Sequence, residues 1–205
     1  MTPDLDRYIT ERLTEIDRID DARRAQLDEL AAFVRSAIES RGAASLTFVC
    51  THNSRRSHMA QIWAQTAAAH FGIADVRTYS GGTEWTAFHT NAVAAIERAG
   101  FVVRRAMGDN NPAYLVWWHP DADPMACFSK VYDHAPNPRE HFAAVMVCDS
   151  ADAACPFVPG ADARFAIRYD DPKAFDGTDR EAEAYDERCR QIAREMLYAF
   201  SRVRG

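Results

Sequence analysis

From residue 45 onward, short apolar runs alternate with segments whose apolar residues recur at a helical period. The pattern predicts strands at residues 46–49, 76–79, 142–147 and 164–169, and helices at residues 57–70, at residues 91–99 and after the capping box at 178–181. Such alternation is typical of an open, largely parallel sheet covered by helices. We therefore expect an α/β fold built on an open, mainly parallel four-stranded sheet flanked by helices.

Two segments lie outside this alternation. Residues 1–42 have the pattern of a helical hairpin, in which Asp20 begins the second helix and Gly42 ends it. This N-terminal extension carries no plausible chemistry, so we assign it to packing or oligomerisation, including a homodimer, and place the catalytic domain at residues 43–205. Residues 104–140, which include two adjacent tryptophans and five prolines, predict a loop or a small hairpin insertion.

Composition excludes several classes of protein. A net charge of −6 argues against non-specific binding to nucleic acid or to an anionic membrane, since both need a surplus of Lys and Arg. No run approaches the roughly 20 apolar residues that span a bilayer, and the acidic N-terminus is unlike a signal peptide. The expected location is cytoplasmic. The five cysteines, an odd number, do not resemble an extracellular disulfide framework, so each cysteine must be explained by chemistry, metal binding or burial.

The most informative segment runs from Cys50, at the end of the first predicted strand, to Ser57, at the start of the next helix. Cys50 and Arg56 have the Cys-x5-Arg spacing. A loop of this length before a helix can turn its backbone N–H groups inward around a tetrahedral oxyanion. The same field favours the thiolate of Cys50, while the guanidinium of Arg56 can hold two oxygens. The expected oxyanion-binding residues are Thr51, His52, Asn53, Ser54, Arg55, Arg56 and Ser57, of which Ser57 would also donate to the thiolate and Asn53 would brace the loop.

Together with Ser80-Gly81-Gly82 after the second strand and Asp171-Pro172 near the end of the domain, this segment resembles the low-molecular-weight tyrosine phosphatase superfamily. Within it, the chain is most similar to the thioredoxin-linked arsenate reductases, over about residues 46–202. The resemblance implies the phosphatase-like fold and makes Asp171 the general acid, in preference to the adjacent Asp170. A carboxyl group above an anion site can protonate a departing oxygen.

A second similarity lies after the third strand, where Cys148 and Cys155 have the spacing of the redox segment of those reductases and Pro156 follows the second cysteine. The resemblance implies a relay: Cys50 attacks arsenate, Cys148 attacks Cys50 as arsenite leaves, and Cys155 then attacks Cys148. Thioredoxin would reduce the resulting disulfide, and no tightly bound cofactor is expected. Because the carboxyl ends of parallel strands share one sheet edge, Cys50 and Cys148 should lie near each other.

The loop also departs from the family. His52 and Arg55 stand where smaller or less charged residues are more usual, and we expect Arg55 to point outward. Gln61 occupies the place of an acidic residue that helps some of these reductases hold potassium, so we do not predict the ion. Residues 173–175, Lys-Ala-Phe, lack the paired tyrosines of eukaryotic tyrosine phosphatases.

Two other functions stay open at the level of sequence. A phosphatase would need only Cys50, Arg56 and Asp171, with Cys148 and Cys155 as packing residues, and a binding protein without turnover would result if the nucleophile or the acid were misplaced. Five Cys and His residues at intervals of seven could suggest zinc, at positions 127, 134, 141, 148 and 155. That interval matches neither a zinc knuckle nor one helix face, so no metal site is predicted.

Overall fold

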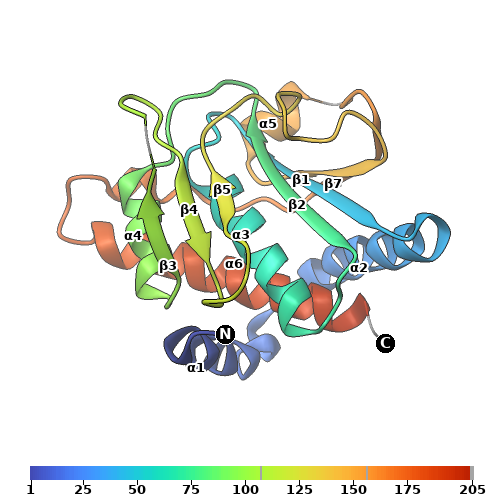
Figure 1. The fold of residues 1–205 in the computed structure, drawn as a ribbon, viewed down its shortest axis with the longest axis horizontal. Helices are drawn as coiled ribbons and strands as arrows, with labels where there is room; N and C mark the ends of the chain where they lie inside the picture. The colour runs from blue at the N-terminus through green and yellow to red at the C-terminus, as the bar shows by residue number, and fades with distance from the viewer. Residues whose placement is uncertain (107, 156, 204–205) are drawn as a thin grey trace.

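The computed structural model describes residues 1–106, 108–155 and 157–203, and Pro156 of the predicted redox segment lies outside them. Its elements in chain order are α1 (Pro3–Leu13), a 3-10 turn η1 (Ile16–Arg18), α2 (Asp21–Arg41), β1 (Ala44–Cys50), α3 (Arg56–His70), β2 (Val76–Gly82), α4 (Thr90–Arg98), β3 (Val102–Arg105), β4 (Tyr114–Trp117), β5 (Met125–Cys127), β6 (Phe142–Met146), α5 (Asp149–Ala154), β7 (Ala161–Ala166), a 3-10 turn η2 (Pro172–Phe175) and α6 (Glu181–Val203) (Figure 1).

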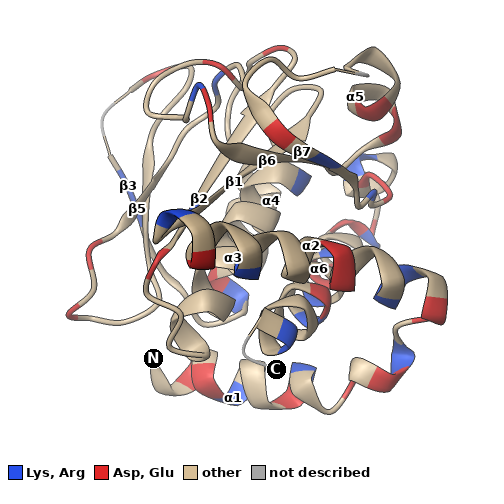
Figure 2. Cartoon of the chain, turned by 90° about the vertical axis from the view of Figure 1, so that its right-hand side faces the viewer, with Lys and Arg blue, Asp and Glu red and all other residues tan. Residues whose placement is uncertain are grey.

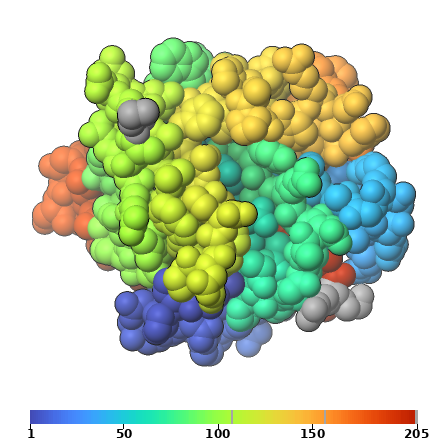
Figure 3. Space-filling model, viewed as in Figure 1, coloured from blue at the N-terminus to red at the C-terminus, as the bar shows by residue number. Residues whose placement is uncertain are grey.

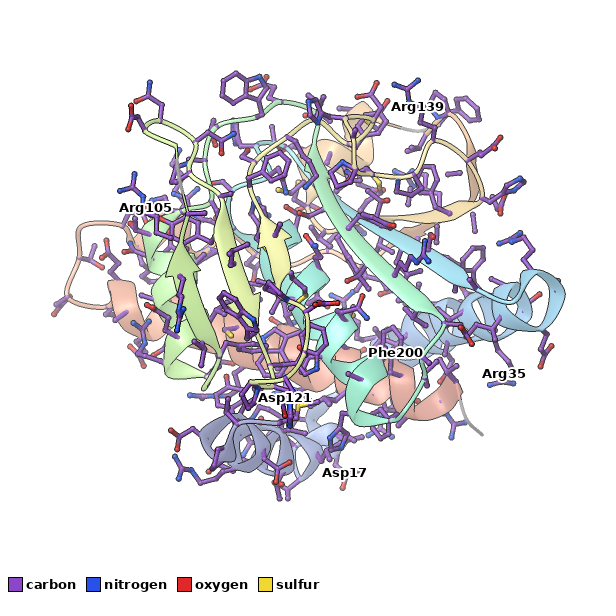
Figure 4. The ribbon with its side chains drawn as sticks, viewed as in Figure 1. Asp17, Arg35, Arg105, Asp121, Arg139 and Phe200 are labelled. Atoms are coloured by element: carbon purple, nitrogen blue, oxygen red, sulfur yellow. The ribbon has the colours of Figure 1, made fainter. Side chains whose placement is uncertain are left out.

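The predicted four-stranded sheet is confirmed. Its order is β2-β1-β6-β7, and every neighbouring pair is parallel. The two central strands, β1 and β6, contain no charged residue, as expected for strands covered on both faces (Figure 2). Helices α2 and α3 pack on β1, and α6 packs against both helices. Phe200 of α6 is buried within this layer, whereas Asp17 and Asp121 lie at the periphery (Figure 4).

The segment at 104–140 differs from the prediction of a loop or small hairpin. Together with β3, its strands β4 and β5 form a separate antiparallel sheet in the order β3-β4-β5. Alternating burial along β4, where Tyr114 and Val116 are buried and their neighbours are partly exposed, gives it one face in the core. Prolines and short strands concealed this sheet from the sequence pattern.

The N-terminal helices form where the sequence predicts them. Thr2 caps α1 by accepting from Leu5 N, Asp20 caps α2 by accepting from Arg23 N, and Gly42 ends α2 with φ +75°. The backbone N–H of Thr2 also donates to Trp118 O at 3.1 Å, so the chain start lies against the second sheet (Figure 3). The apolar sides of α1 and α2 belong to the same buried cluster as the parallel sheet. The division into an extension and a catalytic domain stays a prediction.

In the described residues, no helix is long and apolar enough to cross a membrane.

Candidate functional site

The loop after β1 is built as an anion cradle. Its carbonyl groups turn outward: Cys50 O accepts from Thr83 N at 3.1 Å, Thr51 O from Glu84 N at 2.8 Å, and Ser54 O from His89 N at 2.9 Å. Within the described part of the chain, none of the backbone N–H groups of residues 51–57 donates to another protein group. Several N–H groups beside a helix start are therefore left to face an anion.

Gly82 is required for the close approach of this loop to the end of β2. A Cβ at Gly82 would lie 2.6 Å from Thr51 O and 2.8 Å from Asn53 N, closer than real Cβ atoms approach such groups. Any larger residue there must displace the backbone of the anion loop. Gly82, the last residue of β2, is thus a geometric requirement of the loop.

The predicted nucleophile lies at the base of the cradle, at the C-terminal end of β1. Cys50 is 4% exposed, and its Sγ lies 3.1 Å from Ser57 Oγ. Asn53 Nδ2 donates to Ser57 Oγ at 2.9 Å, which leaves the hydroxyl proton of Ser57 free to point at the sulfur. Asn53 has φ +45°, and its Oδ1 accepts from Lys130 N at 2.9 Å. Asn53 therefore holds the loop and also orients the donor to Cys50.

Arg56 and Asp171 are brought together at the mouth of the loop, although they lie 115 residues apart in the chain. Arg56 donates from one amino group to Asp171 Oδ2 at 2.6 Å and from the other to Tyr169 O at 2.9 Å. The second oxygen of Asp171 accepts from Lys173 N at 3.1 Å and so caps η2. The segment that carries the expected acid is thus held directly by the expected oxyanion ligand.

Arg55 does not point outward as predicted. Its Nε donates to Tyr185 Oη at 2.6 Å and its amino group to Asp176 Oδ2 at 2.9 Å, with the side chain only 11% exposed. Tyr185 Oη in turn donates to Asp176 Oδ1 at 2.7 Å, and burial raises the pKa of Tyr185 to about 12. The His89 ring stacks on Tyr185. The prediction fails because Asp176 and Tyr185 lie more than 120 residues away, and nothing near Arg55 in the sequence announces them.

The two predicted redox cysteines lie at opposite ends of α5. Cys148 is buried and caps the helix, its Sγ accepting from Ala151 N at 3.4 Å, while Cys155 follows the last turn and is partly exposed. The Sγ of Cys148 also lies 3.6 Å from Thr51 Oγ1 of the anion loop. Burial raises the pKa of Cys155, and the nearby Arg164 opposes that rise.

The other two cysteines are buried in the hydrophobic core. Cys189 accepts from Trp63 Nε1 at 3.2 Å, and burial raises its pKa to about 11. Cys127 ends β5 and is fully buried. Within the described ranges, no group of three or more Cys, His, Asp or Glu side chains is placed to hold a metal.

Comparison with known proteins finds similarity both to phosphatases and to arsenate reductases. The family model for low molecular weight phosphotyrosine protein phosphatase matches residues 45–108. An arsenate reductase of Bacillus licheniformis is 28% identical over 157 residues, which cover 77% of this chain and 94% of that protein.

Two solved structures share the fold. A low molecular weight phosphotyrosine phosphatase from Vibrio cholerae superposes with TM-score 0.51 at 16% identity, covering 76% of this chain and 94% of its own. A low molecular weight protein tyrosine phosphatase from T. tengcongensis gives TM-score 0.51 at 17% identity, covering 76% and 97%.

Proposed function

We propose that this chain is a member of the low-molecular-weight phosphatase superfamily and an arsenate reductase that works through a relay of three thiols and is recycled by thioredoxin. The observation that carries the proposal is the position of a second buried thiol beside the loop of the first. Val147 N donates to Val49 O at 2.9 Å, so Cys50 and Cys148 follow directly on paired, neighbouring strands. A hydrolase that uses only Cys50, Arg56 and Asp171 has no need of that second thiol.

The first step uses the anion loop. Arsenate binds to the free N–H groups, and the Cys50 thiolate attacks arsenic, while Asp171 supplies a proton so that one oxygen leaves as water. Cys148 then attacks Cys50 Sγ. The sulfur–arsenic bond breaks, and its electron pair stays on arsenic, which leaves as arsenite. The two thiols are oxidised to a Cys50–Cys148 disulfide as As(V) is reduced to As(III).

The second exchange requires α5 to open. In a helix the seven steps from Cys148 to Cys155 span about 10 Å, whereas disulfide Cα atoms lie about 4–7 Å apart. Once the helix unwinds, Cys155 attacks Cys148 Sγ, Cys50 leaves as a thiolate, and a thioredoxin dithiol reduces the Cys148–Cys155 disulfide. Because burial raises the pKa of Cys155, opening would also increase its nucleophilic fraction.

The test is a single-turnover reaction of fully reduced protein with stoichiometric arsenate, followed by disulfide mapping and by thioredoxin-coupled NADPH oxidation. We expect one arsenite per chain and a Cys148–Cys155 disulfide. Cys155→Ser should stop at the Cys50–Cys148 disulfide after one arsenite, and Cys148→Ser should release none. Cys189→Ser is the matched control, since its hydroxyl can still accept from Trp63 Nε1, and it should turn over normally.

A phosphatase is the second candidate, favoured by the family match and by the fold of the two solved phosphatases. It predicts that wild-type protein loses no thiols to arsenate and yields no arsenite while still binding phosphate. It also predicts that Cys148→Ser hydrolyses aryl phosphate as fast as wild type. Those results together would exclude the reductase.

A further inference from the structure

Lys130, one of the chain's two lysines, is buried beside the anion loop, where its backbone N–H donates to Asn53 Oδ1. It lies three residues after the end of β5, and its Nζ lies 4.6 Å from the centre of the Phe128 ring and donates to Phe128 O at 3.4 Å. Lys130 as a whole is 4% exposed. Nothing in the sequence singles out this residue, because an isolated lysine in a loop is normally solvated.

No negative charge balances this ammonium group. In the described residues, no Asp or Glu carboxylate lies within ion-pair distance of Lys130; the titratable groups that face it are Cys127 and His58. Burial raises the pKa of Cys127 to about 12, so that thiol is neutral. Burial, and next the charge of Lys130, hold the pKa of His58 well below its usual range, so that ring is neutral too. Burial lowers the pKa of Lys130 itself to about 8, which leaves it mostly protonated at neutral pH.

The backbone around Lys130 is joined directly to the anion loop. Lys130 N donates to Asn53 Oδ1 at 2.9 Å, and the preceding Ser129 Oγ donates to His52 O at 2.9 Å. From Asn53 the hydrogen bonds continue through Ser57 to Cys50 Sγ. The ammonium group itself faces the buried ring of His58, the residue that follows Ser57 in α3. The unbalanced charge therefore lies close to the helix start that completes the loop, in a region of low dielectric where charges interact strongly.

We propose that Lys130 is a positioning residue that serves as a fixed, built-in counter-charge for the oxyanion and for the Cys50 thiolate. The inference rests on the anion site of the proposed function but not on arsenate chemistry. A buried unpaired cation costs stability, and replacing one by an apolar side chain of similar volume is often neutral or stabilising. Lys130→Met should therefore affect anion binding and stability in different directions, which a residue with a merely structural role would not do.

The experiment measures inorganic phosphate binding as protection of Cys50 from iodoacetamide, followed on the Cys50 peptide by mass spectrometry, alongside urea unfolding of the same proteins. Lys130→Met keeps the backbone N–H that bonds Asn53. We expect it to weaken phosphate binding by roughly tenfold or more and to slow unprotected alkylation of Cys50 at pH 7. Its urea midpoint should be equal to or higher than that of wild type. Lys130→Arg should recover most of the affinity, and Arg77→Met, which removes an exposed cation of β2, should change neither measurement.

Unchanged phosphate affinity in a folded Lys130→Met protein would overturn the inference, as would a loss of affinity that only parallels a loss of stability. Lys130→Gln, polar and uncharged, provides the same comparison if Lys130→Met does not fold. Wild-type protein that binds phosphate but reduces no arsenate would refute the reductase and leave the role of Lys130 standing. Wild-type protein that binds no phosphate would refute both.

Discussion

Substitutions of Asn53 separate the contribution of its buried hydrogen bonds from that of its left-handed backbone conformation. The side chain is fully buried and makes two hydrogen bonds, to Lys130 N and to Ser57 Oγ, while the backbone has φ +45°. Loss of the side chain leaves a buried N–H unpaired, at about 1–3 kcal/mol, and removes the bond to Ser57, at about 1 kcal/mol. Left-handed backbone costs an alanine about 1–2 kcal/mol more, whereas glycine and asparagine adopt it readily. We therefore expect Asn53→Gly to lower the free energy of unfolding by about 2–4 kcal/mol, and Asn53→Ala by about 3–6 kcal/mol.

Urea denaturation of the folded variants measures these losses, and His141 provides the control. His141 also has a positive φ, +58°, but its side chain is 63% exposed. His141→Ala should be close to wild type, since both residues bear the strain of left-handed backbone, and His141→Gly should differ from it only by the backbone term. If Asn53→Gly were as stable as His141→Gly, the two buried hydrogen bonds would not hold the loop. If Asn53→Ala and Asn53→Gly were equally stable, the strain argument would be wrong.

Three further changes test other parts of the site. Gly82→Ala should abolish phosphate protection of Cys50, because the loop backbone must move. Gly42→Ala, at an open helix end with φ +75°, should lower the free energy of unfolding by about 1 kcal/mol and leave phosphate binding intact. Equal phosphate binding by both variants would refute the close-approach argument. Tyr185→Phe removes the hydroxyl that accepts from Arg55, and should lower the free energy of unfolding by about 1–2 kcal/mol and weaken phosphate binding severalfold, as measured by urea titration and by protection. His58 is neutral in the folded protein because burial lowers its pKa. Between about pH 6.5 and 5 the unfolded chain therefore takes up a proton that the native chain does not, and the free energy of unfolding should fall by roughly 1.4 kcal/mol for each pH unit of acidification from this group. A His58→Gln protein whose stability falls equally with pH would contradict that assignment.

Features encoded within a few residues could be predicted from the sequence. The caps of α1 and α2, the strand before Cys50 and the helix after it all follow from side-chain chemistry or periodicity in a short window. The neighbouring positions of Cys50 and Cys148 followed from one topological rule, that parallel strands end at the same sheet edge. These features involve either local contacts or a regular sheet.

The misplaced or missed features depend on pairings that no short window contains. The sequence predicts Arg55 in solvent because its neighbours do not indicate a contact with Asp176, which lies in a loop 121 residues later in the chain. The second sheet could not be predicted because its strands have only three or four residues, too few to establish a hydrophobic period. The burial of Lys130 could not be predicted because burying a lone cation is disfavoured, and the sequence gives no reason to expect a buried lysine there. Such exceptions to local rules are expected to gather at functional sites.

The pairing of Arg56 with Asp171 bears on how the proposed reaction would begin. In the structure, Arg56 donates to Asp171 and to the Tyr169 carbonyl, so the carboxylate is bonded to a guanidinium N–H group that an oxyanion would need. A doubly charged oxyanion in the cradle competes for the same planar donors and, with more charge, displaces the single carboxylate. In the proposed reaction, Asp171 would then exchange its guanidinium partner for the bound anion. Substrate binding would thus free the carboxyl group for the departing oxygen, while Lys173 N keeps it at the mouth of the loop.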